Sequence, residues 1–409
     1  MEILLVSSEH DWESFLQAQL WTPFLQSFPM GEVYRAVGEE PVRLIITERS
    51  GKEIPNPQPS PRLRPAGNSQ IPNEILGICQ AIVVPAKRGR HLAIPYGPVF
   101  SDGFLQGEER FQVSSLRPVR PRPGGQGYGR QAGFRFLLEE LKRVAREKNC
   151  AFIRMSPFWP KGDLKDFGFR PSPLHLLAEH IWYLPLRGST KHQAPNTKQA
   201  PSTKITEEEI FQNMRATTRN LIRRAEREGV TVSASDDPIR DLPHFLALHE
   251  ETRRRHGFTP YTDGFFRAQV EIFAPRKQCA LYLARYQNEV IAASIHMIYG
   301  GETSYHHGAS TAKYAKIPAS YLLQWTAIRD ALKRGDRVYN FWGIAPLQSS
   351  GSTKHQAPNT KHPFAGVTTF KTGFGGELLE LVHCMDLPLS KRYFITWGIE
   401  TMRKWRRGF

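Results

Sequence analysis

A helix followed by an apolar strand occurs twice in this sequence, and the repetition limits the fold more than any other feature. In the first half, a helical stretch at residues 136–147 leads into the apolar residues 151–155. In the second half, a helical stretch at residues 321–334 leads into residues 338–342. Because a chain of 409 residues exceeds the usual size of one hydrophobic core, each copy is predicted to belong to its own domain.

The second half also contains three successive strand patterns, at residues 279–286, 289–299 and 302–307. The two connections between them have the composition of tight turns: Gln287-Asn288 and Gly300-Gly301. These segments are therefore predicted to form an antiparallel meander. Pro318 should open the helix that follows, and Gly335 should end it. Strands followed by a helix and a strand predict an α+β fold.

Lys371 lies beside Phe370 at the start of a glycine-rich segment, residues 370–376, and a Gly-Ile-Ala-Pro run at residues 343–346 precedes it. Glycines let the backbone approach a substrate closely, so this lysine can bring a positive charge to a substrate oxygen. Acyl transfer from an activated ester requires stabilisation of an oxyanion and no nucleophilic side chain. The segment therefore indicates acyl-transfer chemistry, and the sequence contains no Gly-x-Ser-x-Gly elbow.

Residues 205–228 are predicted to form one basic helix that begins with a Thr206/Glu209 capping box. Four arginines recur at every fourth position and should line one side of it: Arg215, Arg219, Arg223 and Arg227. Such a row suits the phosphates of RNA or of a diphosphate, and the net charge of +16 also favours a polyanionic partner. A solvated helix face is the alternative.

Together with Thr218-Arg219-Asn220 and the strand end from Tyr305 to Ser310, these motifs resemble the Fem family of non-ribosomal peptidyltransferases. Members of that family move amino acids from aminoacyl-tRNA onto peptidoglycan precursors, and the resemblance covers nearly the whole chain. It implies two GNAT-like domains, without a long helical-hairpin arm because the path from Gly257 to Cys279 is short. It also implies a monomer that uses aminoacyl-tRNA as co-substrate and no cofactor.

The resemblance assigns roles to particular residues. Lys371 becomes the oxyanion stabiliser, with Phe370 bracing it. The substrate-binding residues would be these: Arg215, Arg219, Asn220, Arg223, Tyr305, Ser310, Arg35 and Tyr96. Tyr305 and Ser310 would contact the acceptor peptide or the terminal adenosine. Hydrogen bonding within the sheet, without a substrate role, is an equal alternative. Arg35 and Tyr96 lie near motifs that resemble the precursor-binding cleft of the family. The precursor could be a nucleotide-linked (UDP) or a lipid-linked muropeptide.

The predicted domains are residues 1–187 and residues 205–386, separated by a polar linker at residues 188–204. A C-terminal helix at residues 387–409 is expected to return to the first domain. The segment at residues 188–198 recurs without change at residues 351–361. Its Ser, Thr, Lys, Gln and Pro content cannot bury a core, so we interpret both copies as inserted solvent loops.

The four cysteines are far apart and form no Cys-x-x-Cys pair, so buried reduced thiols and no metal site are expected. Residues 1–6 carry no signal-peptide pattern and no segment has the length of a membrane span, which predicts a cytoplasmic protein. The C-terminal residues 391–407 mix aromatic residues with cations. That pattern fits an amphipathic helix packed on a domain or a peripheral contact with the inner membrane face.

Two other functions are compatible with parts of the sequence. Residues 122–127 match the Arg-x-x-Gly-x-Gly pyrophosphate loop of acetyl-CoA-dependent N-acetyltransferases, in a proline-rich context where glycines are common. A non-catalytic tRNA- or RNA-binding protein could use the same basic helix. Affinity for coenzyme A would favour the first, and absence of aminoacyl transfer would favour the second.

Overall fold

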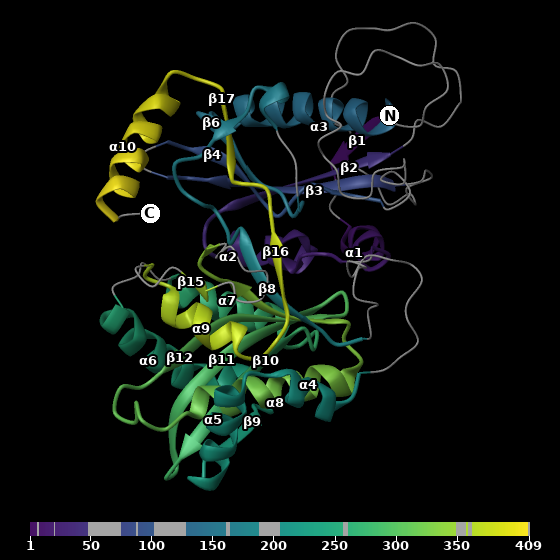
Figure 1. The fold of residues 1–409 in the computed structure, drawn as a ribbon. Helices are drawn as coiled ribbons and strands as arrows, with labels where there is room; N and C mark the ends of the chain where they lie inside the picture. Colours follow the sequence, from purple (N-terminus) through teal and green to yellow (C-terminus); the bar gives the residue numbers. More distant parts are fainter. Residues whose placement is uncertain are drawn as a thin grey trace, which may run out of the picture. The chain divides into compact units, whose positions relative to one another are not determined.

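The computed structural model describes residues 1–5, 8–19, 21–47, 75–86, 89–101, 128–160, 164–187, 205–256, 261–348, 357–358 and 362–407. The chain forms two compact units (Figure 1): Met1–Glu179 with Glu380–Phe409, and His180–Leu379. The pyrophosphate-loop pattern at residues 122–127 and the first copy of the duplicated segment lie outside the described residues. Of the second copy, only Ala357 and Pro358 are described.

The division between the units falls earlier in the chain than the predicted ends of the domains at residues 187 and 386. Strand β8 (His180–Pro185) pairs with β13 in the second sheet, so the second unit already begins at His180. Strand β17 (Met385–Pro388) pairs with β6 in the first sheet. The C-terminal segment therefore returns first as a strand, and its helix begins only at Arg392, after the predicted start at residue 387.

The first unit contains a mixed sheet with the strand order β1-β2-β3-β4-β6-β17-β7, and β5 pairs with β3. Its strands other than β17 are β1 (Glu2–Leu5), β2 (Glu40–Thr47), β3 (Ile75–Val84), β4 (His91–Pro95), β5 (Val99–Phe100), β6 (Phe152–Ser156) and β7 (Arg170–Pro171). Its helices are α1 (Glu9–Gln17), η1 (Phe24–Gln26), α2 (Phe28–Ala36), α3 (Tyr128–Glu147), η3 (Lys165–Phe167) and α10 (Arg392–Arg407).

Alternation along the strands of the first unit sends successive side chains to opposite faces of the sheet. Val42 and Leu44 of β2 pack with Leu137 and Leu141 of α3 in one apolar cluster. Helix α2 packs on β2 and β3, and Figure 1 shows α3 and α2 on opposite sides of the sheet.

The second unit is built on a sheet with the strand order β16-β8-β13-β12-β11-β10-β9. The strands of this unit besides β8 are β9 (Thr231–Ala234), β10 (Cys279–Tyr286), β11 (Glu289–Tyr299), β12 (Glu302–Ser310), β13 (Val338–Gly343), β14 (Leu347–Gln348), β15 (Ala357–Pro358) and β16 (Glu377–Glu380). Strands β14 and β15 form a separate two-stranded sheet. Its helices are α4 (Glu207–Asn213), α5 (Ala216–Arg227), α6 (Pro238–His256), α7 (Asp263–Phe273), α8 (Ala319–Arg334) and α9 (Ala365–Thr372). Both units mix helices with a sheet, as the sequence predicted.

The predicted meander and the caps of the helix after it are confirmed. Strands β10, β11 and β12 pair antiparallel in sequence order. Gln287 and Asn288 adopt φ values of 50° and 65°, the left-handed conformation that a two-residue hairpin of the I′ type requires. Pro318 is the N-cap of α8, and Gly335 ends it with φ of 83°.

The basic segment is two helices rather than the single predicted helix. The Thr206/Glu209 capping box opens α4 as expected. Met214 and Arg215 are then extended, and the Arg215 N–H donates to the carbonyl of Gly373 at 2.9 Å. Because this tertiary hydrogen bond replaces one within the helix, α4 ends at Asn213 and a separate helix, α5, begins at Ala216.

The four cysteines are buried and none forms a disulfide, which agrees with the sequence. Among the helices of the described ranges, none combines the length and the apolar character needed to cross a membrane. The structure also contains no long helical-hairpin arm in the described part of the second unit, where the short helix α7 occupies most of the span between α6 and β10.

Candidate functional site

Lys371 lies in the last turn of α9, so a helix holds it and not the flexible segment that the sequence suggested. The residue is only 7% exposed. Its Nζ donates a hydrogen bond to the carbonyl oxygen of Gly343 at 2.6 Å and lies 5.7 Å from the centroid of the Tyr305 ring. The Lys371 ammonium group thus connects the glycine-rich segment to the start of the Gly-Ile-Ala-Pro run.

Burial lowers the pKa of Lys371 to about 7, because the charged form loses its hydration. The same effect raises the pKa of the Tyr305 hydroxyl to about 12, which keeps the neighbouring phenol neutral. At neutral pH the lysine is therefore close to the midpoint of its titration. Such a group can present a cation to a developing oxyanion and can also exchange a proton.

The lysine is positioned where two parallel strands stop pairing. The ladder between β12 and β13 runs from Glu302 with Val338 to Ser304 with Asn340. On its other side, β12 pairs with β11 through a bulge in which His306 is the extra residue. Bulges re-aim side chains and recur beside active sites. Here the bulge directly follows Tyr305, whose ring lies near Lys371.

A strained residue lies on β13 beside this bulge. Trp342 has φ of 66°, a left-handed conformation that a bulky side chain rarely adopts. The conformation is held by a hydrogen bond from the Trp342 N–H to Asn340 Oδ1 at 2.7 Å. The Trp342 ring meets the His306 ring edge-on at 5.0 Å. Strain of this kind concentrates at functional sites, where the surrounding structure maintains it.

Helix α9 is fixed to the Gly-Ile-Ala-Pro run by a buried threonine. Thr368 Oγ1 accepts a hydrogen bond from the Ala345 N–H at 2.8 Å and donates one to the Phe364 carbonyl at 2.9 Å. Phe370 packs against Tyr321 of α8 and against Phe374, with ring centroids 4.9 and 5.4 Å apart. Phe370 therefore packs α9 against α8 and Phe374, while Lys371 donates to the Gly343 carbonyl.

The basic segment and the lysine helix are brought together although they are far apart in sequence. Arg215 donates from its two terminal nitrogens to the Thr369 carbonyl and to Thr372 Oγ1, both at 3.3 Å. Thr218 is buried, and a side chain at Gly373 would overlap its hydroxyl. Only glycine permits this close approach, so Gly373 links α5 to the end of α9.

The other predicted members of the basic segment are placed differently. Arg219 donates from Nη1 to the carbonyls of Gln212 and Met214 at 2.7 and 2.5 Å, and so caps the end of α4. Asn220 is exposed. Arg223 is exposed as well, with its guanidinium 5.1 Å from the Phe211 ring. The arginine row thus has two halves. Arg215 and Arg219 donate to backbone carbonyls, whereas Arg223 and Arg227 are exposed to solvent.

Ser310 is not brought to Lys371. It lies five residues beyond Tyr305 on β12, which in a strand corresponds to roughly 16 Å. Its N–H donates to Thr252 Oγ1 of α6, and its carbonyl accepts from Arg255.

In the first unit, Tyr96 is buried and its hydroxyl donates to the Ala178 carbonyl at 2.8 Å. Gln26 lies beside it, where its Nε2 donates to the Pro95 carbonyl at 2.7 Å and its Oε1 accepts from the Gln80 N–H. Gln26 and Tyr96 are therefore neighbours in the fold. Arg35 is exposed and pairs with Glu32, which also pairs with the buried Arg43.

Sequence reasoning assigned no role to three residues that contact one another around the bulge: His306, Trp342 and Gln269. Gln269 is fully buried, and its amide nitrogen lies 3.4 Å from His306 Nδ1. Burial lowers the pKa of His306 to about 3, so this imidazole is neutral. A histidine pair in a strand was the one signal in the sequence, because the bulge and the left-handed Trp342 have no local signature.

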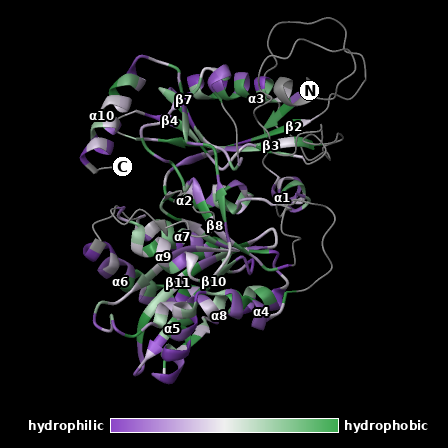
Figure 2. Cartoon of the chain, in the orientation of Figure 1, coloured by the Kyte–Doolittle hydropathy of each residue, from purple (hydrophilic) through white to green (hydrophobic). Residues whose placement is uncertain are grey.

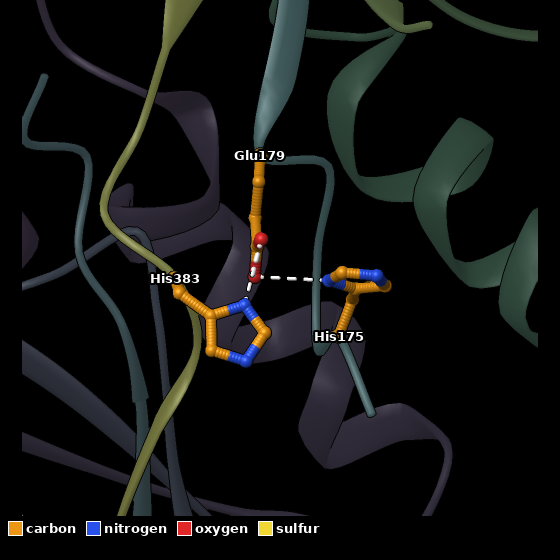
Figure 3. Close-up of side chains that lie close together, drawn as sticks. All are labelled: His175, Glu179 and His383. Atoms are coloured by element: carbon orange, nitrogen blue, oxygen red, sulfur yellow. Dashed lines mark hydrogen bonds and ion pairs between the residues drawn. The ribbon is translucent and has the colours of Figure 1, made fainter. Parts of the chain in front are cut away.

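A second cluster of titratable groups lies in the first unit. Figure 3 shows Glu179 between the rings of His175 and His383. Its carboxylate oxygens lie 3.0 Å from His175 Nδ1 and 2.9 Å from His383 Nδ1, and one of them accepts from the Cys384 N–H at 2.8 Å. His383 Nε2 lies 3.0 Å from the Ser172 carbonyl.

Within the described ranges, these three side chains are the only group of His, Cys, Asp or Glu near enough to hold a metal ion, with ligand atoms within 4.8 Å. Both ring nitrogens of His383 face oxygen acceptors, which is the arrangement of a protonated imidazole. We therefore interpret the cluster as a pair of ion pairs. Burial opposes ionisation of Glu179, but the hydrogen bonds from the two histidines and Cys384 outweigh it and lower its pKa to about 2.

The cluster should stabilise the fold in a defined pH range. The hydrogen bond to Glu179 raises the pKa of His383 above 6.5, although burial and Lys404 act against it. The stabilisation from His383 is complete below its unfolded pKa of about 6.5 and is lost as pH rises through the higher folded value. That from Glu179 is complete above about 4.5 and is lost as pH falls through about 2.

Replacing His383 by Asn should therefore lower the melting temperature most between pH 4.5 and pH 6.5, which are the ordinary pKa values of the two groups. The difference from the parent should shrink towards pH 9 or so, where His383 is neutral. Melting curves across pH in the presence of EDTA measure this, with His10→Asn as an exposed-histidine control. A pH-independent difference would show that the ion pair is not the source of the effect.

Comparisons with known proteins agree with this architecture. Residues 212–352 match the acetyltransferase (GNAT) domain family. Over 98% of its length, the chain superimposes on the crystal structure of FemX, all of which is covered, with a TM-score of 0.68 at 16% identity. At that identity the match shows the fold alone. Both units therefore belong to the GNAT-like α+β fold that the sequence predicted.

Sequence relatives carry a more specific name. Aminoacyltransferase FemA of Staphylococcus epidermidis strain RP62A is 20% identical over 332 residues, covering 63% of this chain and 76% of that protein. Aminoacyltransferase FemA of Staphylococcus aureus strain bovine RF122 is 30% identical over 107 residues, covering 26% of this chain and 23% of that protein.

Proposed function

The chain is a member of the Fem family of aminoacyltransferases, and from this premise we propose that it moves an amino acid from aminoacyl-tRNA to the stem peptide of a peptidoglycan precursor. The reaction would build an interpeptide bridge. The observation that supports it most is the position of Lys371, which is buried, bonded to Gly343 and braced by the basic segment through Arg215.

The chemistry of the transfer fits this position. When the acceptor amine attacks the ester carbonyl, the carbonyl oxygen becomes an oxyanion, and the C–O bond to the tRNA ribose then breaks. An ammonium group at that oxygen stabilises the charge in a site of low dielectric, where such an interaction is strongest. Lys371 has two N–H groups beyond the one that Gly343 accepts, so it can serve a substrate without losing its anchor.

The remaining parts of the proposal concern the partners. Aminoacyl-tRNA is the co-substrate, and no separate cofactor is needed because the ester is already activated. The acceptor is a nucleotide-linked or lipid-linked muropeptide, and a lipid-linked acceptor would require peripheral contact with the membrane. Monomeric state and a cytoplasmic location complete the proposal.

One assay tests the proposal against its rivals. The protein is incubated with a pool of charged tRNAs and with each muropeptide precursor in turn, and the products are analysed by mass spectrometry. Addition of an amino-acid residue to the stem peptide is the expected result. Acetylation from acetyl-CoA in a parallel reaction would favour an N-acetyltransferase, and binding of tRNA without any transfer would favour a non-catalytic RNA-binding protein.

The exposed half of the arginine row should contact phosphates of the tRNA. Replacing Arg223 and Arg227 together by Gln should weaken tRNA binding and reduce the slope of log affinity against log salt by about 1.5, since two phosphate contacts are lost. Filter binding over a salt series measures both. Arg240→Gln with Arg254→Gln makes the same charge change on α6, and an equal effect there would assign the loss to net charge alone.

A further inference from the structure

Helix α10 exposes an apolar surface that is large for a single helix. Five large hydrophobic side chains on it are at least one-third exposed: Phe394 at 52%, Ile395 at 64%, Trp397 at 37%, Met402 at 49% and Trp405 at 84%. Scattered hydrophobic residues on a surface need no explanation, but a contiguous set marks an interaction site. Figure 2 shows hydrophobic and hydrophilic residues alternating along this helix.

The exposed apolar residues share one side of the helix. At 100° per residue, Phe394, Trp397 and Trp405 fall within about 80° of one another, and Ile395 and Met402 extend this side. We define these five residues as the outer face of α10. Tyr393 and Thr396, both buried, project from the opposite side.

The inner side of α10 is anchored to the first unit. Tyr393 packs edge-on against Phe152 at 5.2 Å, and its hydroxyl donates to Asp386 at 3.2 Å. Arg154 of β6 forms an ion pair with Glu400 at 2.7 Å and donates to Asp386 as well. Because these groups are buried and mutually paired, the helix cannot rotate to cover its outer face without leaving charges unpaired.

The charges of α10 indicate which kind of partner its outer face can bind. Five exposed cations lie on α10 or directly before it: Lys391, Arg392, Arg403, Lys404 and Arg406. At 100° per residue, Arg406 and Lys404 fall on the two borders of the outer face. The one acidic residue of the helix, Glu400, is already paired with Arg154. Two copies of this surface would bring like charges together. An apolar face with tryptophans, flanked by cations, is instead the composition of helices that lie in the headgroup region of anionic membranes.

We propose that the outer face of α10 docks on the surface of an anionic phospholipid bilayer. The helix lies parallel to the surface, with Trp397 and Trp405 between headgroups and acyl chains and the cations among lipid phosphates. This docking does not depend on aminoacyl transfer. It deepens the proposed function by naming the surface through which the protein would approach a lipid-linked acceptor.

The test is flotation of the full-length protein with vesicles of phosphatidylglycerol and phosphatidylcholine, and with vesicles of phosphatidylcholine alone. The protein should float with the anionic vesicles and much less with the neutral ones, and added salt should weaken the binding. Trp397→Ser with Trp405→Ser should reduce the bound fraction by about tenfold or more. Ile239→Ser, which removes a hydrophobic residue 44% exposed on α6, should leave binding unchanged.

Melting curves verify that the variants fold, which is expected because the altered side chains are exposed. Equal binding of parent and Trp variant, or no binding to anionic vesicles, would overturn the proposal. So would a dimer of the parent in sedimentation that the Trp variant loses, since a second copy would then cover the face. Transfer to the soluble nucleotide-linked precursor should be the same in both proteins, so a failure of transfer and a failure of docking remain distinguishable.

Discussion

Replacement of Lys371 by Met should lower the turnover of aminoacyl transfer by at least about a hundredfold, the typical cost of losing one donor to an oxyanion. Methionine nearly preserves the length and the apolar stem of lysine, so α9 should keep its packing. The hydrogen bond to Gly343 is lost, but the charge that had to be desolvated is lost with it. The variant should therefore fold and still bind tRNA.

Single-turnover kinetics separate this effect from binding, because a loss confined to the chemical step lowers the rate at saturating substrate. Lys313→Met is the matched control, since Lys313 is exposed and pairs with Glu289 on the surface. Turnover within about threefold of the parent for Lys371→Met would remove the lysine from the mechanism. Loss of activity in both variants would indicate a general effect of charge.

The pH dependence offers an independent check on the same residue. If the ammonium form acts, the contribution of Lys371 falls as pH rises through its pKa of about 7. The acceptor amine must be neutral to attack, so its contribution rises with pH, and the two together give a bell-shaped profile. Lys371→Arg stays charged at every accessible pH and should lose the descending side of the bell while keeping part of the activity.

Signals confined to a few residues predicted the local structure well. The Gln287-Asn288 turn, the Thr206/Glu209 capping box and the Gly335 cap depend on neighbours in the chain, and all three are present. The helix break at Met214 was not predictable in this way. Its replacement hydrogen bond comes from Gly373, far away in sequence, and an uninterrupted helical pattern carries no trace of that partner.

The sequence suggested candidate residues for the site but gave no indication of their physical state. The motif around Lys371 suggested an accessible cation in a flexible segment, whereas the residue is buried on a helix and has a lowered pKa. The burial of Lys371 depends on Tyr305 and on Gly343 at the end of β13, which come close to the lysine only in the folded sheet. Arg219 likewise looked like a phosphate ligand, because a sequence cannot show that its donors already hold the carbonyls that end α4.

Among glycine-to-alanine substitutions in the second unit, Gly376→Ala should lower the stability most. Gly376 has φ of 110°, a conformation that residues with a side chain rarely adopt. A Cβ atom there would overlap the backbone carbonyl oxygen of Tyr183 and lie 3.0 Å from its carbonyl carbon. Neither atom can move alone, because Tyr183 on β8 pairs with Asn340 of β13 within the sheet.

Strain and overlap together should cost about 3 kcal/mol or more, which lowers the unfolding midpoint of this unit by roughly 6 to 12 °C. Gly366→Ala is the matched control, since Gly366 lies in α9 and a Cβ atom there would meet nothing within 4 Å. Alanine favours a helix over glycine, so this change should be neutral or stabilising by about 0.5 to 1 kcal/mol. Thermal unfolding of both variants compares them directly. Equal midpoints would mean that the chain between α9 and β16 does not pass as close to β8 as the structure places it.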